Sequence, residues 1–252
     1  MLRTTVDSCE LYIGRNAGKG LEEALKNARK SVKVFSPYVS YSFLDLLVDK
    51  CSRNIDVSMI TTSEAVNNGF YKKLINQHRH AREDALQKRK QGRLVTLTLG
   101  LVFLLLFGAS FNFEFGSFQI AEHFIRWRWA FLAASVLSFI VRNFYGKIRI
   151  YDYTYSQNLR FAVVVSPNEV KADEAYLAHA KYYIIDDEIA FLGSLNFTYS
   201  GFNKSYESCV RIQDGKVIEK LNSEFEWMFS NDRTLYEAVQ TLGPKIYKEP
   251  PY

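Results

Sequence analysis

The sequence predicts an α/β fold in which a mixed, mostly parallel sheet flanked by helices is interrupted by a two-helix transmembrane hairpin. Strand-like and helix-like segments alternate over residues 10–62, and such an alternation is typical of parallel strands covered by helices. A run of 20 uncharged residues, Leu94–Phe113, follows in the middle of the chain and is long enough to cross a bilayer. Strand-like segments then resume after residue 147.

The first part of the sheet is predicted from three strands and two helices. The segments ELYIG, VKVFSPYV and IDVSMITT, which begin at residues 10, 32 and 55, are rich in β-branched and aromatic residues, as strands are. Between them, GKGLEEALKNARKS and SFLDLLVDKCSRN place apolar residues at helical spacing. We therefore expect a β-α-β-α-β unit with helices packed on the sheet.

A basic segment and two apolar segments occupy the middle of the chain. From about Asn68, the residues FYKKLINQHRHAREDALQKRKQGR predict a long polar helix, of which residues 76–93 form a basic juxtamembrane part. The run from Leu94 predicts the first membrane span. In the second apolar segment, the uncharged core from Trp129 to Val141 is short for a span. Flanking arginines can snorkel and tryptophans can anchor at the interface, so a tilted second span is expected.

The expected topology of the sheet requires these two segments to form a hairpin. The strands before and after them are expected to share one sheet, so the chain must cross the membrane an even number of times, within residues 94–142. Basic residues flank both ends, which by the positive-inside bias places both flanks in the cytoplasm. The chain is therefore expected to be a multi-pass protein of an inner or plasma membrane, with a cytoplasmic catalytic domain built from residues 1–75 and 143–252. The flanking residues are Lys88, Arg89, Lys90, Arg93, Arg142, Lys147 and Arg149.

After the hairpin, KIRIYDYTY and LRFAVVVSP predict two strands, and KVIEKLNSEFEWMFS predicts a closing amphipathic helix. Between them, HAKYYII alternates like a strand and would place His179, Lys181 and Tyr183 on one face. A turn and a second strand, IAFLGS, follow, and Gly193 is expected to let the backbone approach a ligand closely.

The polar residues of this region suit a phosphodiester. Lys181 supplies positive charge, and Ser194 and Asn196 supply donors where negative charge accumulates in a transition state. A neutral imidazole can attack phosphorus, and a neighbouring ammonium disfavours its protonation. A carboxylate on the other ring nitrogen would fix the tautomer, and either Asp186 or Glu207 could supply it.

The pattern H-x-K-x(4)-D-x(6)-G-S-x-N, with an acidic residue eleven positions after the Asn, resembles the signature of the phospholipase D superfamily. The resemblance implies a metal-independent phosphodiesterase or phosphatidyltransferase without a cofactor, in which one His forms a phosphohistidine and a second His protonates the leaving group. It makes His179 the nucleophile or the acid, Lys181 and Asn196 phosphate ligands, and Ser194 a supporting hydrogen-bonding residue. Asp186 and Glu207 become orienting carboxylates.

Only one copy of this pattern is present. The other histidines, His78, His80 and His123, have neither a Lys two residues later nor a downstream GSxN. The second His is therefore expected from another chain, and the resemblance to single-motif members implies a homodimer with its site on the twofold axis.

The composition of the chain gives general indications of its partners and its cellular compartment. The net charge of +5 favours phosphate-bearing partners but does not choose between nucleic acid and an anionic membrane. The three cysteines are odd in number and lack metal or disulfide spacing, which indicates a reducing compartment and no zinc site.

Three functions remain open. A membrane-anchored nuclease acting on DNA or RNA is favoured, because the resemblance is to single-motif nucleases and a basic surface suits polyanions. The alternative is a phospholipase D or phosphatidyltransferase acting on membrane phospholipids, and the minor alternative is a catalytically silent membrane scaffold. A lipid enzyme needs an apolar rim, for which Phe197, Tyr199 and Phe202 are candidates, whereas a nuclease needs stacking aromatics such as Tyr182 or Tyr206.

Overall fold

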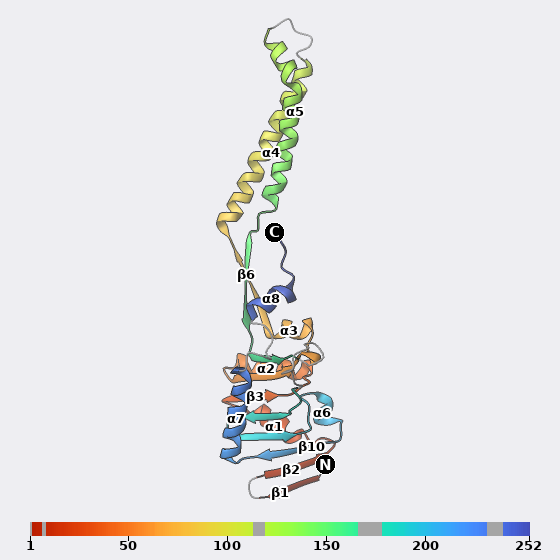
Figure 1. Cartoon of the computed structure of the whole chain (residues 1–252), viewed down its shortest axis with the longest axis vertical. Coiled ribbons are helices and arrows are strands. Elements are labelled where there is room, and N and C mark those ends of the chain that lie inside the picture. The colour runs from red at the N-terminus through yellow and green to blue at the C-terminus, as the bar shows by residue number, and fades with distance from the viewer. Residues whose placement is uncertain (1, 7–8, 113–118, 166–177, 231–238) are drawn as a thin grey trace. The chain divides into compact units, whose positions relative to one another are not determined.

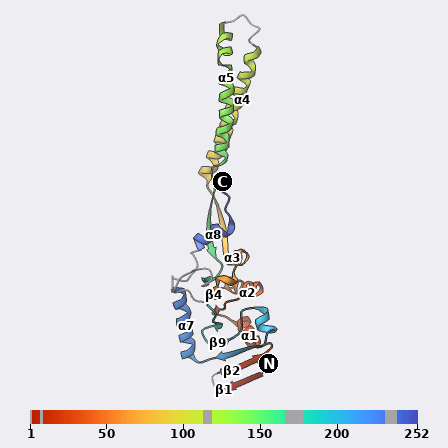
Figure 2. The same cartoon turned by 45° about the vertical axis from the view of Figure 1, so that its right-hand side comes forward.

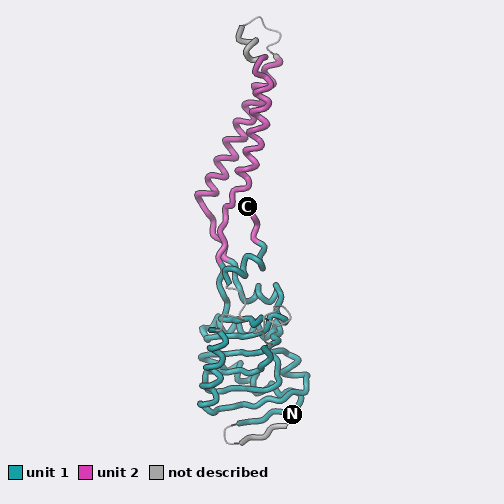
Figure 3. The backbone as a smooth tube through the Cα atoms, in the orientation of Figure 1, with its two compact units in different colours: residues 1–77, 155–248 teal, residues 78–154, 249–252 magenta. Residues whose placement is uncertain are grey.

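The computed structural model describes residues 2–6, 9–112, 119–165, 178–230 and 239–252. The chain divides into two compact units (Figure 3). Unit 1 contains residues 1–77 and 155–248, and unit 2 contains residues 78–154 and 249–252. Residues 78–154 of unit 2 are thus an insertion in the sequence of unit 1.

Unit 1 is built on an eight-stranded sheet with the order β1-β2-β10-β9-β8-β3-β4-β7 (Figure 1). The strands are β1 (Leu2–Val6), β2 (Cys9–Gly14), β3 (Ser31–Phe35), β4 (Asp56–Thr62), β7 (Arg160–Val164), β8 (Tyr182–Ile185), β9 (Ile189–Gly193) and β10 (Glu207–Ile212). Strands from both sides of the insertion therefore share one sheet, as the sequence predicted.

The α/β class and the mixed sheet are confirmed, but the parallel part is smaller than expected. Parallel pairing joins β3 to β4 and β4 to β7. The pairs β1-β2, β2-β10, β10-β9, β9-β8 and β8-β3 are antiparallel. The reason is that β1-β2 and β8-β9 are hairpins and β10 inserts between them, and hairpin connections are too short for a parallel crossover.

Helices cover the sheet on both faces. The predicted helices appear as α1 (Lys19–Asn27), α2 (Tyr41–Ser52) and α7 (Gly215–Ser230). On one face, Ile218, Phe225 and Met228 of α7 form a buried cluster with residues of the sheet. Val32 and Val34 alternate to the opposite face and are also fully buried. Shorter helices are η1 (Ser63–Ala65), α3 (Asn68–Leu74), α6 (Tyr199–Asn203) and α8 (Val239–Tyr247).

Unit 2 contains two long helices, α4 (Glu83–Asn112) and α5 (Gln119–Gly146), which run side by side in both views (Figures 1 and 2). The segments Glu83–Phe111 and Arg126–Gly146 are long and apolar enough to cross a membrane, judged by length and composition. Small residues bring the helices together: the Ser135 hydroxyl donates to the Gly100 carbonyl at 2.9 Å. The Phe139 ring packs against Gly100.

The single long helix predicted from Asn68 is wrong in its middle. Residues Ile75–Ala81 form a strand, β5, which pairs with β6 (Tyr151–Gln157) in a separate two-stranded ribbon. The Arg79 guanidinium lies 4.5 Å from the centre of the Tyr151 ring, and His80 Nε2 lies 2.9 Å from the Thr154 hydroxyl. These cross-strand contacts override the helix propensity of the segment. They also explain why unit 2 extends to residue 154 rather than ending at residue 142.

The strands β9 and β10 approach each other closely at Gly193. A Cβ atom at this position would lie 2.1 Å from the carbonyl oxygen of Ser208, on the backbone of β10. The expected role of Gly193 in approaching a ligand is therefore replaced by close approach of a neighbouring strand.

We expect Gly193→Ala to lower the free energy of unfolding by about 1–3 kcal/mol, the usual cost of overpacking. The matched control is Gly215→Ala, at a position where a Cβ meets nothing within 4 Å at the start of α7. The control should be neutral or slightly stabilising. Thermal unfolding of the three proteins checks this, and equal stability of wild type and Gly193→Ala would show that the strands can separate without cost.

Candidate active site

The antiparallel register of three strands brings the ends of the sequence motif together. In β8 and β9, Tyr182 is paired with Leu192, and in β10 and β9, Cys209 is paired with Gly193. The start of β8, the end of β9 and the start of β10 therefore lie at the same edge of the sheet. Residues next to these strand ends must be neighbours, although up to 28 positions separate His179 from Glu207 in the sequence.

His179 and Lys181 lie in an extended segment that leads into β8. His179 is exposed, whereas Lys181 is only 8% exposed. The Lys181 ammonium lies 3.2 Å from Nδ1 and 3.3 Å from Nε2 of the His179 ring. It also donates to the His179 carbonyl at 2.9 Å. Tyr183, expected on the same face, is instead buried in unit 1, where its hydroxyl donates to the Leu195 carbonyl at 2.5 Å.

The ammonium of Lys181 is held in a partly dehydrated position. Burial lowers the pKa of Lys181, and the negative charge of Glu207 opposes this shift. A buried ammonium that keeps only part of its hydration interacts strongly with an anion that enters the site.

Ser194 and Glu207 form a second pair at this edge. The Ser194 hydroxyl donates to the Glu207 carboxylate and accepts the backbone N–H of Ser208 at 3.0 Å. The backbone N–H of Ser194 in turn donates to the Ser208 carbonyl at 2.9 Å. These bonds fix both side chains, and Glu207 is the carboxylate whose charge acts on Lys181.

Asn196 lies on the loop that follows β9. Its side-chain oxygen Oδ1 is buried and has no hydrogen-bond partner among the residues that the structure describes. The loop is fixed around it, because the Phe197 N–H donates to the Ser36 hydroxyl at 2.9 Å and the Ser40 N–H donates to the Phe197 carbonyl at 3.0 Å. These contacts fix the backbone of the loop and do not involve the side-chain amide of Asn196.

Asp186 does not join this group, contrary to the expectation that it could orient the histidine. It follows β8 at the opposite end of that four-residue strand, which is roughly 13 Å long and separates it from Lys181. Its carboxylate accepts the backbone N–H groups of Arg29, Lys30 and Ser31 at 2.7 to 3.1 Å. It therefore stabilises the junction between α1 and β3, and Glu207 remains as the carboxylate near Lys181.

Exposed tyrosines lie on segments close in sequence or in space to the motif loop. Tyr199 is 56% and Tyr206 is 77% exposed, and the Lys204 ammonium lies 5.5 Å from the centre of the Tyr199 ring. Tyr38 and Tyr41, which sequence reasoning missed, are also exposed. A bridge between Val39 and Phe197 brings their loop to the motif loop. No local signal reveals this neighbour, because it depends on a contact between residues about 160 positions apart.

The other aromatic candidates are packed inside unit 1. Phe197 and Phe202 are fully buried, with ring centres 5.6 Å apart, and both contact Phe43. Tyr182 is buried and stacks on Phe35 with ring centres 5.1 Å apart. Of the residues considered for a lipid rim, only Tyr199 is thus available at the surface, and of those considered for stacking, only Tyr206 is.

Within the described ranges, no group of three or more His, Cys, Asp or Glu side chains comes together as metal ligands do. All three cysteines are free thiols, and burial raises the pKa of Cys209 to about 12. The groups gathered at the sheet edge are an imidazole, an ammonium, a hydroxyl and a carboxylate, and the Asn196 amide lies on the loop that follows β9. Together they can bind a phosphate and offer it a nucleophile.

Part of the chain matches a known protein family. Residues 145–229 match the family model described as cardiolipin synthase, PLD-like domain, where PLD stands for phospholipase D. This match bears out the resemblance of the motif to the phospholipase D superfamily and places a phospholipase D-like domain on this segment. No curated protein matches the chain.

Three solved structures show distant overall likeness. NucT from Helicobacter pylori is 15% identical, with a TM-score of 0.44, and the alignment covers 91% of this chain and 98% of that one. Nuc from Salmonella typhimurium, a phospholipase D family member, is 13% identical, with a TM-score of 0.43 and coverage of 91% and 99%. Phosphatidylserine synthase from Haemophilus influenzae is 12% identical, with a TM-score of 0.41 and coverage of 95% and 45%. At values this low, overall likeness does not assign an activity.

The geometry of Asp186 predicts an effect on stability rather than on turnover. Although burial favours its neutral form, the three backbone N–H donors hold its pKa below the usual value. Its stabilisation is therefore present above the unfolded-state pKa and is lost as the pH falls through the folded-state pKa. Asp186→Asn should lower the free energy of unfolding by about 1–3 kcal/mol at neutral pH, and its difference from wild type should shrink in acid.

Denaturant titrations at several pH values check this prediction, with turnover measured at a temperature where both proteins are folded. Asn tolerates the positive φ of 56° at this position, so the variant tests the carboxylate alone. Loss of turnover at unchanged stability would contradict this prediction and show that Asp186 acts in catalysis.

Proposed function

We propose that this chain, with its phospholipase D-like domain at residues 145–229, is a membrane-anchored, metal-independent phosphodiesterase that cleaves DNA or RNA. The contact between the exposed His179 ring and the buried Lys181 ammonium, 3.2 Å apart, carries this proposal. Next to it, the Ser194–Glu207 pair is fixed at the same sheet edge. Such a set binds an anionic phosphorus centre and presents a nucleophile to it.

The reaction would run through a phosphohistidine in two steps. The neutral His179 ring attacks phosphorus, so that a P–N bond forms as the P–O bond to the leaving group breaks. A protonated histidine gives its proton to the leaving oxygen and then, as a neutral base, takes a proton from water. The resulting hydroxide attacks phosphorus, the P–N bond breaks, and His179 leaves as neutral imidazole. Lys181 and Asn196 would hold the phosphate oxygens, with Ser194 and Glu207 supporting the site.

The second histidine would come from a second copy of the chain. The motif occurs once in the sequence, and His78 and His80 belong to unit 2, outside the domain that carries His179. A homodimer with its site on the twofold axis places two copies of the motif at one phosphate, because an isologous interface repeats each residue across the axis.

Nucleic acid is the substrate that the surface favours. The exposed Tyr199 and Tyr206 offer ring faces beside the site, and Lys204 adds positive charge. Proteins bind single nucleic-acid strands with this combination of stacking aromatics and cations. An acyl chain would need apolar side chains instead, and the candidates Phe197 and Phe202 are fully buried.

Phosphatidyl transfer is the second candidate, favoured by the family model's description as cardiolipin synthase and by the two apolar helices. A lipid-processing enzyme gains from a tether that keeps it at head-group level. The exchange of a head group onto an alcohol would use the same phosphohistidine, with the alcohol replacing water in the second step.

Membrane anchoring is proposed from the surface of α4 and α5. Large apolar side chains on these helices are solvent-exposed, among them Leu94 at 63%, Leu105 at 73% and Leu137 at 60%. A water-exposed apolar surface of this extent is unfavourable, whereas in a bilayer it contacts lipid chains. With basic residues at both ends of the hairpin, the catalytic unit would lie on the cytoplasmic side.

We expect the purified full chain to cleave nucleic acid in the presence of EDTA, and His179→Ala to lose that activity by at least a thousandfold, since covalent catalysis then has no nucleophile. The assay offers single-stranded DNA, duplex DNA, RNA and mixed phospholipid micelles in parallel. Unchanged far-UV circular dichroism of His179→Ala controls for folding.

The outcomes of this assay distinguish the nuclease, the phosphatidyltransferase and the scaffold. Release or exchange of phospholipid head groups without nucleic-acid cleavage would replace the nuclease with the phosphatidyltransferase. Complete inhibition by EDTA would contradict the metal-independent mechanism. Absence of turnover on every substrate would favour the catalytically silent membrane scaffold.

A further inference from the structure

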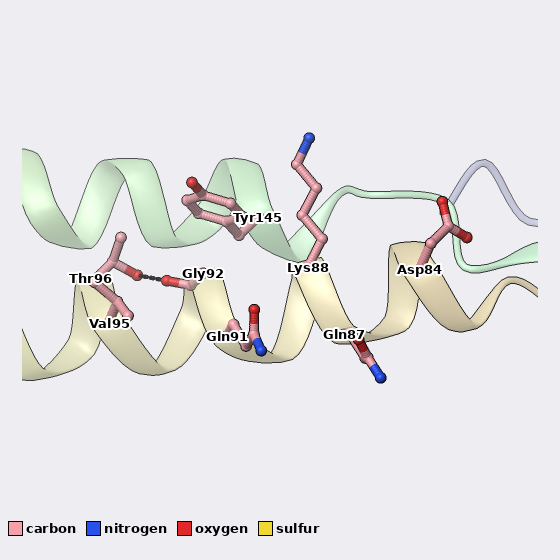
Figure 4. A pocket seen from close by; sticks show the side chains of 8 residues that line it. All are labelled: Asp84, Gln87, Lys88, Gln91, Gly92, Val95, Thr96 and Tyr145. Carbon is pink, nitrogen blue, oxygen red and sulfur yellow. Dashed lines mark hydrogen bonds between the residues drawn. The ribbon is translucent and has the colours of Figure 1, made fainter.

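A cavity lies between α4 and α5 near the ends of the helices that carry the basic residues (Figure 4). Its volume is about 470 Å³, within the range of about 300–1,000 Å³ typical of small-ligand sites. It lies wholly within unit 2, far in sequence from the His179 motif, and the proposed catalysis does not use it. The lining residues that matter below are Asp84, Lys88, Gln91, Gly92, Thr96 and Tyr145.

Close packing forms the inner wall of this cavity. The Tyr145 ring lies directly on Gly92, where a Cβ atom would be 2.1 Å from the ring. The Thr96 hydroxyl donates to the Gly92 carbonyl at 2.6 Å and so turns its polar group back onto α4 (Figure 4). The cavity therefore has a fixed wall made of an aromatic ring, and apart from Gly92 and Val95 its other lining residues are polar.

The position of the cavity along the helices matches the depth of lipid head groups. The uncharged run begins at Leu94, so at 1.5 Å per residue Gln91 and Lys88 lie about 4.5 and 9 Å beyond its end. The head-group layer occupies about 5–8 Å on each side of the hydrocarbon core, so the backbone of Lys88 lies just outside this layer and its long side chain can reach into it. On α5 the apolar core ends at Val141, which places Tyr145 about 6 Å beyond it.

The charges at this depth favour an anion. Lys88 extends from α4 towards the end of α5 (Figure 4), and in the described part of the chain it has no ion-pair partner. Asp84, the acidic group of the lining, lies 3.8 Å from the Arg82 guanidinium. One turn before Tyr145 on α5, the Nε of Arg142 is buried without a hydrogen-bond partner among the described residues. Arg142 does not line the cavity, but its positive charge at this depth adds to the attraction for an anion.

We propose that this cavity binds the phosphate group of one anionic phospholipid, taken from the leaflet next to the basic flanks. The Lys88 ammonium pairs with the phosphate, the Gln91 amide donates to it, and the acyl chains continue along the apolar surface of the helices. The site is distinct from the diffuse attraction that any basic flank exerts on anionic lipid. It rests on the membrane anchoring proposed above, but not on the choice of catalytic substrate.

The test counts bound lipid by native mass spectrometry. The full chain carries His179→Ala so that lipid is not turned over, and it is purified in detergent with added phosphatidylglycerol or phosphatidylcholine. We expect one phosphatidylglycerol per chain, bound about tenfold more weakly in Lys88→Gln, since a hydrogen bond to a charged group is lost. The matched control is Lys90→Gln, which removes the same charge from the same helix at a residue outside the cavity lining, and it should bind as well as the parent. Lys88→Arg should also retain the lipid.

Three results would overturn the site. Equal weakening by Lys88→Gln and Lys90→Gln would show diffuse electrostatic attraction. Equal retention of phosphatidylcholine would remove the preference for an anionic lipid. Displacement of the lipid by an equal concentration of inorganic phosphate would assign the cavity to a free anion. Alkaline extraction of membranes reports anchoring separately, so release of the parent chain from the membrane would identify a failure of the anchor rather than of the lipid site.

Discussion

The close pairing of β9 with both of its neighbours is the constraint on which the candidate active site depends. Lys181 precedes β8, Ser194 follows β9 and Glu207 begins β10, so none of these side chains meets another unless the three strands keep their register. Gly193 makes this possible, because any side chain there would collide with the Ser208 carbonyl, 2.1 Å from its Cβ position. The backbone bonds from Gly193 to Lys181, at 3.2 Å, and from Ser194 to Ser208, at 2.9 Å, continue the same pairing up to the site. The chemistry at the sheet edge is thus a consequence of strand register.

The sequence predicted the parts of this arrangement that are local. The motif residues and the alternation of β3, α1, α2 and β4 depend on spacing within single segments, and these are the elements that the structure reproduces. The location of Asp186 depends instead on three backbone donors at Arg29, Lys30 and Ser31, about 155 positions away. Its position in the motif gives no sign of that contact. The motif predicts which residues are special, but it does not separate those that meet substrate from those that fix the fold.

Two further features of the structure were not predicted from the sequence, for the same physical reason. The segment Ile75–Ala81 has the composition of a polar helix, but pairing with Tyr151–Gln157 makes it a strand. The segment that carries Tyr38 comes next to the motif loop through the bridge between Val39 and Phe197. Conversely, Phe197 and Phe202 look suitable for a surface rim, yet they fill the space between α6 and the sheet. Burial depends on the assembled layers, which local patterns do not contain.

The account is tested most directly by dimers in which one copy carries His179→Ala. The two forms are co-expressed with different affinity tags at varied ratios, and mixed dimers are isolated by purification on both tags in succession. A site that needs a histidine from each copy predicts that mixed dimers are essentially inactive, so that activity of the unseparated mixture follows the square of the wild-type fraction. A linear decline, with mixed dimers at half of the wild-type rate, would show that each chain works alone and would contradict the shared site.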